Sequence, residues 1–267
     1  MIINEMIESY QEQGLNEFFA KIKVLQDIFM IKLEKSKYSN NITFKGGTVM
    51  FQITKEKRRT TKDLDIDLIN LGLDRITSII NEIGKWDEET KTTFYVLENK
   101  TEKLSHEDYE GKRLFLEFKD EKLYKTEMLI DIGVHKHLEI NQEILFFDVI
   151  GSKKGVELLA NPIEQMIVEK TSAIIKFGTF TTRIKDIFDI YYLINNSKYK
   201  KDVVLEYIKI LFLKTEKTKS ILEYKKRIKE TLSSKRIKNK LNESDNWLDV
   251  ESEDIVESII KFFNSLK

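Results

Sequence analysis

Between residues 15 and 35, apolar side chains recur every three to four positions. This spacing places them along one side of a helix, because an α-helix completes a turn in about 3.6 residues. We expect the helix to cover a sheet, and it carries no candidate for chemistry. The apolar stripe consists of Phe18, Ile22, Leu25, Phe29 and Leu33.

Short apolar or alternating runs, separated by turn residues, predict strands in the middle of the chain. These runs cover residues 42–45, 63–68, 92–97, 112–119, 126–134 and 143–150. Helices are predicted from Val49 to Lys55 and from Asp74 to about Gly84. After Gly151–Gly155 the spacing becomes helical, with Pro162 in the first turn of a helix that ends near Phe177.

The order of these elements predicts an α/β (α+β) chain of two lobes. Residues 1–155 would form a mixed-sheet domain with an N-terminal helix. Residues 156–267 would form an all-helical domain that closes a cleft over the first. At 267 residues the chain is long enough to bury a substantial core in this way.

The composition is that of a soluble globular protein with a charged surface, since 41% of residues are apolar and 34% are charged. The absence of cysteine excludes a disulfide framework, a thiolate metal site and a cysteine nucleophile. No apolar run reaches the roughly 18 residues of a membrane span. The N-terminus also lacks the basic region of a secretory signal, so we expect a cytoplasmic protein without a membrane partner.

A glycine pair, Gly46-Gly47, joins the strand that begins at Ile42 to a predicted helix, and Thr48 follows it. Backbone N–H groups at a helix start point toward an anion. Glycine lets a phosphate approach the main chain because it has no Cβ. The pair is therefore a candidate phosphate-binding turn, although a Gly-Gly pair alone is also typical of an ordinary turn.

Three aspartates, Asp63, Asp65 and Asp67, alternate along the next predicted strand and therefore share one face of it. Carboxylates on one face repel each other unless a cation lies among them. Oxygen ligands suit Mg²⁺, which binds one or two carboxylates together with substrate phosphates. An alternating acidic strand can also be a solvated sheet edge. A phosphate-binding turn followed closely by such a strand nevertheless indicates metal-dependent nucleotide chemistry.

Asp131 interrupts the apolar run 128–132, where burial of a carboxylate is costly unless it is paired or bound to a metal. It is therefore a candidate site residue, and Glu127 on the same strand face is the alternative. His135 and His137 continue the alternation. Two histidines without cysteine make a poor structural zinc site, so we favour ordinary strand-end residues.

Lys170 lies in an otherwise apolar helical stripe. Either its ammonium extends to water or it contacts an anion in a cleft. In the second case we expect Lys170→Met to keep the fold and to weaken nucleotide use. In the next helix, Asp186 and Asp189 are three residues apart and hence neighbours on its surface. They are either structural partners of Arg183 and Lys185 or functional groups.

These segments occur in the order found in one group of nucleotidyltransferase-fold proteins. The chain resembles the AbiEii/AbiGii-type toxins, which include the MenT toxins, over roughly residues 42 to 194. The matching motifs are Lys45-Gly46-Gly47-Thr48, Arg59-Thr60-Thr61-Lys62-Asp63-Leu64-Asp65, Glu169-Lys170, and Lys185-Asp186 with Asp189. Four motifs in order make the resemblance specific, whereas the first helix and the last third match only in general character.

The resemblance implies that Asp63 and Asp65 form a metal pair and that Asp131 is the third carboxylate of the metal site. It leaves the role of Asp67 open. The implied cofactor is Mg²⁺, with Mn²⁺ as the alternative. The implied catalytic residues are Asp63, Asp65, Asp131, Lys170, Asp186 and Asp189. The implied nucleotide-binding residues are Lys45, Gly46, Gly47, Thr48, Arg59, Lys170 and Lys185.

The resemblance also implies a nucleotidyltransferase that moves NMP from an NTP to the 3′ acceptor end of a tRNA and releases pyrophosphate. Its biological role would be that of a toxin in a toxin–antitoxin or abortive-infection system, with a cognate antitoxin as partner. Two alternatives remain. A related enzyme could modify a protein or a small molecule, or the chain could be a catalytically silent RNA- or partner-binding module. The clustered acids disfavour the silent module, because a binder of anions has no use for them.

Charge is distributed unevenly, although 45 basic and 45 acidic residues balance overall. Residues 198–240 contain fifteen Lys and Arg against five Asp and Glu, a net charge of +10, whereas residues 241–267 carry −5. The two segments could simply face each other. Alternatively the basic segment binds the phosphate backbone of tRNA, with three tyrosines available for stacking on bases. These are Tyr199, Tyr207 and Tyr224.

Overall fold

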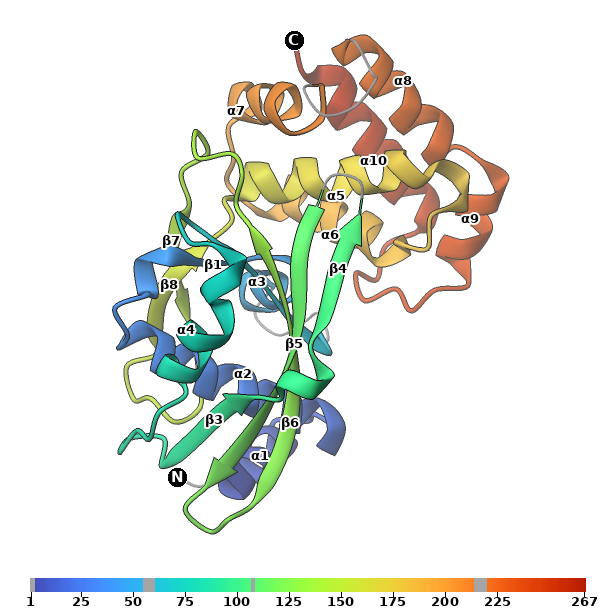
Figure 1. The fold of residues 1–267 in the computed structure, drawn as a ribbon. Coiled ribbons are helices and arrows are strands. Elements are labelled where there is room, and N and C mark those ends of the chain that lie inside the picture. The colour runs from blue at the N-terminus through green and yellow to red at the C-terminus, as the bar shows by residue number, and fades with distance from the viewer. Residues whose placement is uncertain (1–2, 55–60, 107–108, 214–219) are drawn as a thin grey trace. The chain divides into compact units, whose positions relative to one another are not determined.

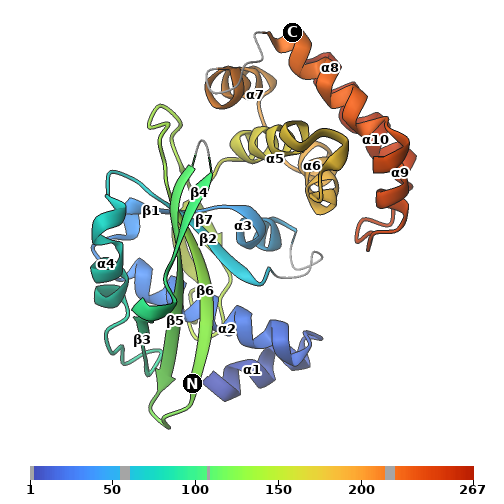
Figure 2. The same ribbon diagram turned by 45° about the vertical axis from the view of Figure 1, so that its right-hand side comes forward.

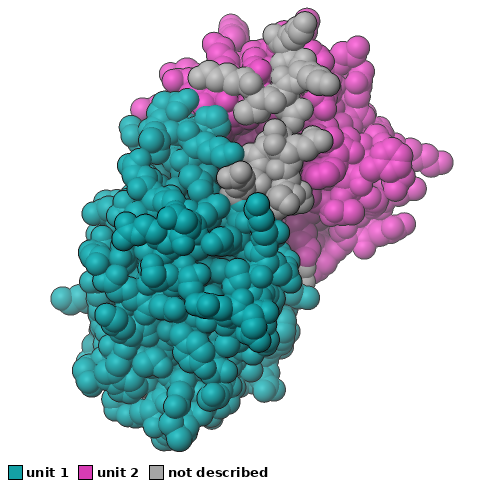
Figure 3. All heavy atoms as spheres, viewed as in Figure 1, with its two compact units in different colours: residues 1–161 teal, residues 162–267 magenta. Residues whose placement is uncertain are grey.

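The computed structural model describes residues 3–54, 61–106, 109–213 and 220–267. It divides into two compact units, Met1–Asn161 and Pro162–Lys267, shown in teal and magenta in Figure 3. Unit 1 combines a mixed sheet with helices, and the described elements of unit 2 are helical, which confirms the predicted α+β class. The boundary expected after residue 155 falls before strand β8 (Val156–Ala160). The structure divides after β8, because this strand hydrogen-bonds within the sheet of unit 1.

The strands of unit 1 form one sheet with the order β3-β5-β6-β2-β1-β8-β7, and β4 pairs with β5. The pairs β2–β6 and β1–β8 are parallel, and the other pairs are antiparallel. Figure 2 shows the long β5–β6 hairpin in green. The remaining strands are β1 (Ile42–Phe44), β2 (Asp63–Leu68), β3 (Thr92–Val96), β4 (Glu102–His106), β5 (Tyr109–Asp120), β6 (Lys125–Val134) and β7 (Glu143–Phe147).

The apolar pattern predicts six of these strands, but not β4 and β8. Strand β4 consists largely of charged and polar residues, and it is held by its pairing with β5 rather than by an apolar face. Strand β8 directly follows the glycine-bounded turn 151–155 and completes the sheet between β1 and β7. Pairing partners distant in the sequence therefore define both strands, which is information that a local pattern lacks.

The described residues of unit 1 form four α-helices, which Figure 1 labels. They are α1 (Ile3–Glu12), α2 (Glu17–Glu34), α3 (Gly46–Ile53) and α4 (Ile76–Ile83). Helix α2 packs against β8 and β6, as the predicted covering helix should. The predicted one-sided stripe is wrong in two respects. Every residue from Ile22 to Leu33 is buried, and Phe18, in the first turn, is 54% exposed.

Burial of the polar residues of α2 is offset by specific partners. The Asp27 carboxylate accepts hydrogen bonds from the Lys23 ammonium, the Tyr10 hydroxyl on α1 and the backbone N–H of Ile150. Burial raises the pKa of Asp27 and outweighs the lowering by Lys23 and the hydrogen bonds. The buried Lys32 ammonium donates to two backbone carbonyl groups near β3. Polar residues can therefore lie on the buried faces of α2, because each has a partner that offsets the cost of its burial.

The helices of unit 2 pack around an aromatic cluster. They are α5 (Ile163–Phe177), α6 (Ile184–Asn196), α7 (Lys201–Ile208), α8 (Ile221–Leu232), α9 (Lys235–Asn242) and α10 (Ser252–Ser265). Tyr224 lies between Phe212 and Phe263 and is fully buried. The expectation that Tyr224 is available for stacking on bases is therefore wrong. No helix among the described residues is long and apolar enough to cross a membrane.

Candidate active site

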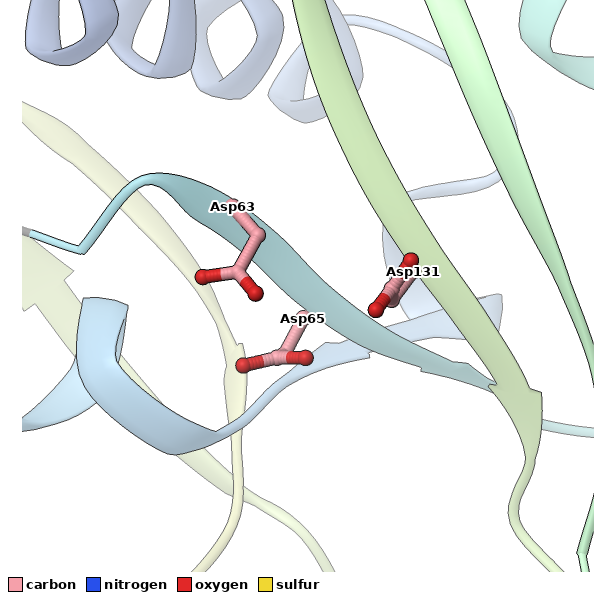
Figure 4. A group of neighbouring side chains, drawn as sticks. All are labelled: Asp63, Asp65 and Asp131. Atoms are coloured by element: carbon pink, nitrogen blue, oxygen red, sulfur yellow. The ribbon is translucent and has the colours of Figure 1, made fainter. Parts of the chain in front are cut away.

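The parallel strands β2 and β6 bring three aspartates together. Asp65 on β2 lies opposite Asp131 on β6 in the strand register, and Asp63 precedes Asp65 by two residues. The three carboxylates each offer an oxygen within 4.8 Å of the others, and all three residues are half-buried. Figure 4 shows these side chains side by side on their two strands. A pairing between segments more than sixty residues apart thus completes the cluster that the β2 motif begins.

This cluster fits a divalent cation. Three carboxylates at such distances repel one another, and a cation among them removes that repulsion. All potential ligand atoms in the group are carboxylate oxygens, which hard cations such as Mg²⁺ and Mn²⁺ prefer. Because the side chains are only half-buried, oxygens of a substrate have access to the same ion.

The glycine pair lies directly against the cluster, at the start of α3. Gly46 has a φ of +63°, and a Cβ there would lie 2.5 Å from the Asp65 Oδ2 atom. A Cβ on Gly47 would lie 2.7 Å from the Cβ of Thr61, whose hydroxyl donates to the Asp63 carboxylate. Both glycines are therefore needed for the close approach of the α3 N-terminus to the β2 aspartates. The same absence of side chains leaves the backbone N–H groups accessible to an anion beside the cluster.

Arg113 on β5 is the site residue that the sequence pattern misses. Its Nε and Nη2 atoms donate to the two oxygens of Asp131, both at 2.8 Å. The hydrogen bond with Asp131 raises the pKa of Arg113, and the charges of Asp131, Glu102 and Asp63 add to this effect. This bidentate geometry fixes the orientation of the Asp131 carboxylate. The signal that could have found Arg113 is the β5–β6 hairpin, because its tight turn fixes a register in which Arg113 faces Asp131.

Asp67 does not belong to the carboxylate group, although it follows the same alternation. It is 7% exposed, and its Oδ1 atom lies 2.6 Å from the Lys45 Nζ atom. Its Cα is paired with Thr43 on the neighbouring strand β1, two residues before Lys45. Lys45 therefore compensates the charge of a buried carboxylate, and Asp67 anchors the strand that leads into the glycine turn.

A second charged cluster lies within unit 2. The Lys170 Nζ atom on α5 is 2.6 Å from Asp186 Oδ1 and 2.8 Å from Asp189 Oδ2 on α6. Burial lowers the pKa of Lys170, but the two carboxylates outweigh burial and the pKa is raised overall. Burial raises the pKa of Asp186. Lys170 and the more distant Arg183 lower that pKa by more than burial raises it, so the net shift is downward. Lys170 thus contacts an anionic group, as one interpretation of the sequence required, but the anion is part of the protein.

The sequence model of one protein family, described as "Nucleotidyl transferase AbiEii toxin, Type IV TA system", matches residues 28–254. The chain belongs to this AbiEii family of nucleotidyltransferase toxins. No curated protein matches it. A solved structure described as an antigenic nucleotidyltransferase-like protein from Paracoccidioides brasiliensis is similar, with 12% identity and a TM-score of 0.42. The similarity covers 71% of this chain and 89% of that chain.

Arg59, Thr48 and Lys185 are three further residues of the AbiEii motifs. Arg59 lies outside the described residues. Thr48, the third residue of α3, is buried, and its hydroxyl has no hydrogen-bond partner among the residues that the structure describes. Lys185 is exposed on α6 and belongs to neither charged cluster in the described structure.

The alternatives to Asp131 lie elsewhere on or after β6. The Glu127 carboxylate is 2.8 Å from the Lys100 ammonium and is 42% exposed, outside the carboxylate group. His135 is buried just beyond the end of β6, where its Nε2 atom lies 3.3 Å from the Ile140 carbonyl oxygen. His137 lies 3.8 Å from Glu139. These contacts match the interpretation of the histidines as strand-end residues.

Several basic side chains of segment 198–240 bind the backbone of unit 2. Lys225 donates to the Leu266 carbonyl oxygen at 2.5 Å, Arg227 to that of Ile175 at 3.1 Å, and Lys240 to that of Thr181 at 2.7 Å. These three residues therefore have structural partners. Other basic residues of the segment, including Lys226, Lys229, Lys235 and Arg236, are exposed.

Proposed function

We propose that this AbiEii family member is a Mg²⁺-dependent enzyme that transfers NMP from an NTP to the 3′ end of a tRNA. The observation that carries the proposal is the group Asp63, Asp65 and Asp131 beside the glycine turn at Gly46. An enzyme that handles a triphosphate needs carboxylates to hold a divalent ion and a backbone turn to hold phosphates. Mn²⁺ would fit the same oxygen ligands.

In this proposal Asp63 and Asp65 hold the metal, and Asp131 completes the site. When bound, Mg²⁺ offsets the charge of the phosphates and favours attack on the α-phosphorus. The acceptor hydroxyl oxygen forms a bond to that phosphorus, while the bond to the β-phosphate breaks and pyrophosphate leaves. Asp131, oriented by Arg113, accepts the proton of the hydroxyl.

By the family motifs, the N–H groups of Gly46 and Gly47 would bind the triphosphate. The hydroxyl of Thr48, which has no hydrogen-bond partner among the described residues, would provide a further polar group. By the family motifs, Arg59 and Lys185 contribute positive charge. Lys45 belongs to the same motifs, although its ammonium also compensates Asp67. Lys170 belongs to the same proposed set, and Asp186 and Asp189 act with it by fixing the position of its ammonium.

The biological role in this proposal is that of a toxin acting in the cytoplasm, where modified tRNA 3′ ends would block translation. The Type IV toxin–antitoxin description of the family supports an antitoxin as a partner in that system. The basic segment 198–240 supports a polyanionic acceptor, since its net charge is +10.

The test is incubation of the protein with each labelled NTP, Mg²⁺ and total RNA, followed by identification of the labelled molecule. We expect label at tRNA 3′ ends with the wild-type protein and none with Asp65→Asn, whose folding should be unchanged because a like charge is removed from an acidic group. Glu127→Gln is the matched control, since it removes a carboxylate from β6 outside the group. Full activity of Asp65→Asn would contradict the assignment, and label on a protein or small molecule would exclude the tRNA acceptor.

A further inference from the structure

Two aromatic side chains are exposed in the turn that joins α5 to α6. Phe180 is 72% exposed and Phe177 is 54% exposed. They lie only three residues apart, at either end of the short turn that Gly178 begins with a φ of +54°. Exposed phenylalanines are unfavourable in water, so a pair of them in one turn indicates a surface that contacts a partner.

This turn is held in place by side chains from other helices. Arg227 on α8 donates to the carbonyl oxygen of Ile175, just before the turn. Lys240 on α9 donates to the carbonyl oxygen of Thr181, just after it. The Thr181 side chain also accepts the N–H of Arg183. The two rings are therefore presented by a fixed backbone, so that binding would cost little ordering of the turn.

A cation already covers part of one ring. The guanidinium carbon of Arg236, in the first turn of α9, lies 4.5 Å from the centroid of the Phe180 ring. This is a cation–π contact between segments more than fifty residues apart. Phe180 keeps 72% of its surface exposed in spite of it, so most of the ring remains available to a ligand.

The surrounding charge is mainly positive. Residues 176–185 contain Lys176, Arg183 and Lys185 and no acidic residue, and all three cations are exposed. The next residue, Asp186, has its Oδ2 atom 3.4 Å from the Arg183 Nη1 atom, but Arg183 stays 54% exposed and can also contact a phosphate. Residues 235–240, which supply Arg236, contain four basic residues and no acidic one. A partner that fits both the rings and the cations must combine flat apolar surfaces with negative charge. Unpaired nucleotides have this combination, since every base has a π-face and every linkage carries a phosphate.

We propose that Phe177, Phe180 and Arg236 form a stacking site for the unpaired bases of the RNA acceptor, with Arg183 and Lys235 contacting its phosphates. This inference rests on the proposed function, because it names the surface that holds the RNA that the enzyme modifies. Stacking of this kind tolerates any base sequence. In a duplex the base faces are stacked on one another, so a duplex can bind this surface only through its phosphates.

The experiment measures binding of a 5′-labelled single-stranded RNA and of a blunt RNA duplex of the same length by fluorescence anisotropy, at several salt concentrations. For Phe177→Ala/Phe180→Ala we expect affinity for the single strand to fall at least about fivefold per ring lost. Affinity for the duplex and the salt slope should stay unchanged, since no charge is removed. Leu222→Ala is the control, because Leu222 is an equally exposed apolar residue of unit 2, 78% exposed, outside the turn.

Two further variants separate stacking from charge. Phe180→Trp should retain the wild-type affinity for the single strand, because it keeps an aromatic face. Lys235→Gln should lower the salt slope for the single strand by about 0.7, because it removes one phosphate contact. In the transfer reaction, the double phenylalanine variant should show a raised KM for RNA with a nearly unchanged kcat.

The outcomes distinguish this inference from the proposed function. If the wild-type protein labels RNA and the double variant binds the single strand normally, the stacking site is wrong and the proposed function stands. Equal losses of affinity for the single strand and for the duplex would also overturn the stacking site, because they indicate a change in general electrostatics or in folding. If the wild-type protein neither binds nor labels RNA, the inference fails together with the RNA acceptor.

Discussion

Replacing Lys170 with methionine removes the cation between two carboxylates while keeping a side chain of similar length. The side chains of Lys170, Asp186 and Asp189 are 11%, 14% and 0% exposed. Removing one partner of a buried ion pair costs about 3–5 kcal/mol, because the remaining charge loses its compensation in a poorly solvated place. A domain has only about 5–15 kcal/mol of stability in total. We therefore expect Lys170→Met to weaken unit 2 severely, whereas the sequence alone suggested that folding would survive.

The protein contains a suitable reporter for this measurement. Of its two tryptophans, Trp247 belongs to unit 2 and its ring packs 5.4 Å from that of Tyr192 on α6. In a Trp86→Phe background, the fluorescence of Trp247 during urea unfolding follows unit 2 by itself. Lys185→Met is the control, since an exposed lysine on α6 should change the free energy of unfolding by no more than about 0.5 kcal/mol.

The effect should depend on pH in a defined direction. The folded-state pKa of Asp186 is lowered, so its contribution is present above the unfolded pKa of about 3.9 and is lost as pH falls through the folded value. The pKa of Lys170 is raised, so its contribution is complete below about pH 10.4 and is lost only as pH rises through the folded value. In Lys170→Met the main group that lowers the pKa of Asp186 is gone, and burial raises that pKa. The difference in unfolding free energy between wild type and Lys170→Met should thus be largest near neutral pH and should narrow as pH falls, beginning above the ordinary aspartate pKa of about 3.9.

A variant that removes all three charges tests the cause. Lys170→Met combined with Asp186→Asn and Asp189→Asn should be more stable than Lys170→Met alone, since no uncompensated carboxylate is left. The reasoning is refuted if Lys170→Met unfolds within about 1 kcal/mol of wild type at neutral pH. In that case the ammonium would be dispensable for folding, and its place between the carboxylates would have another purpose.

Two further substitutions test the site in unit 1. Gly46→Ala should lower the free energy of unfolding by about 1–2 kcal/mol, because Gly46 has a left-handed backbone conformation that alanine disfavours. It should also lower NMP transfer at least tenfold, because the new Cβ would displace the Asp65 carboxylate. Gly14→Ala, also at positive φ but with open space around it, should lose stability without losing activity; equal activity losses in both would contradict the steric argument. Arg113→Gln should bind Mn²⁺ more tightly in a calorimetric titration, since the carboxylate group loses a neighbouring positive charge, and should transfer NMP more slowly because Asp131 loses its orientation. Weaker Mn²⁺ binding by this variant would show that Arg113 supports the ion site.

Local sequence was sufficient where local geometry decides the result. The alternation of Asp63 and Asp65 on one strand and the turn at Gly46 follow from the backbone periods and from the conformational freedom of glycine, and the structure contains both. The helical period placed Asp186 and Asp189 on neighbouring positions of one helix. In the structure both carboxylates contact the Lys170 ammonium.

What the local pattern could not determine is which neighbour each charge meets. The same alternation assigned Asp67 to the face of Asp63 and Asp65, yet Asp67 pairs with Lys45 because β1 lies beside β2. Arg113 reaches Asp131 only through the register of the β5–β6 hairpin. Burial of a charge costs free energy that depends on the atoms around it, and those atoms come from distant segments of the chain. The sequence therefore determined which residue types lie at the site, and the tertiary structure decided which of them compensate one another.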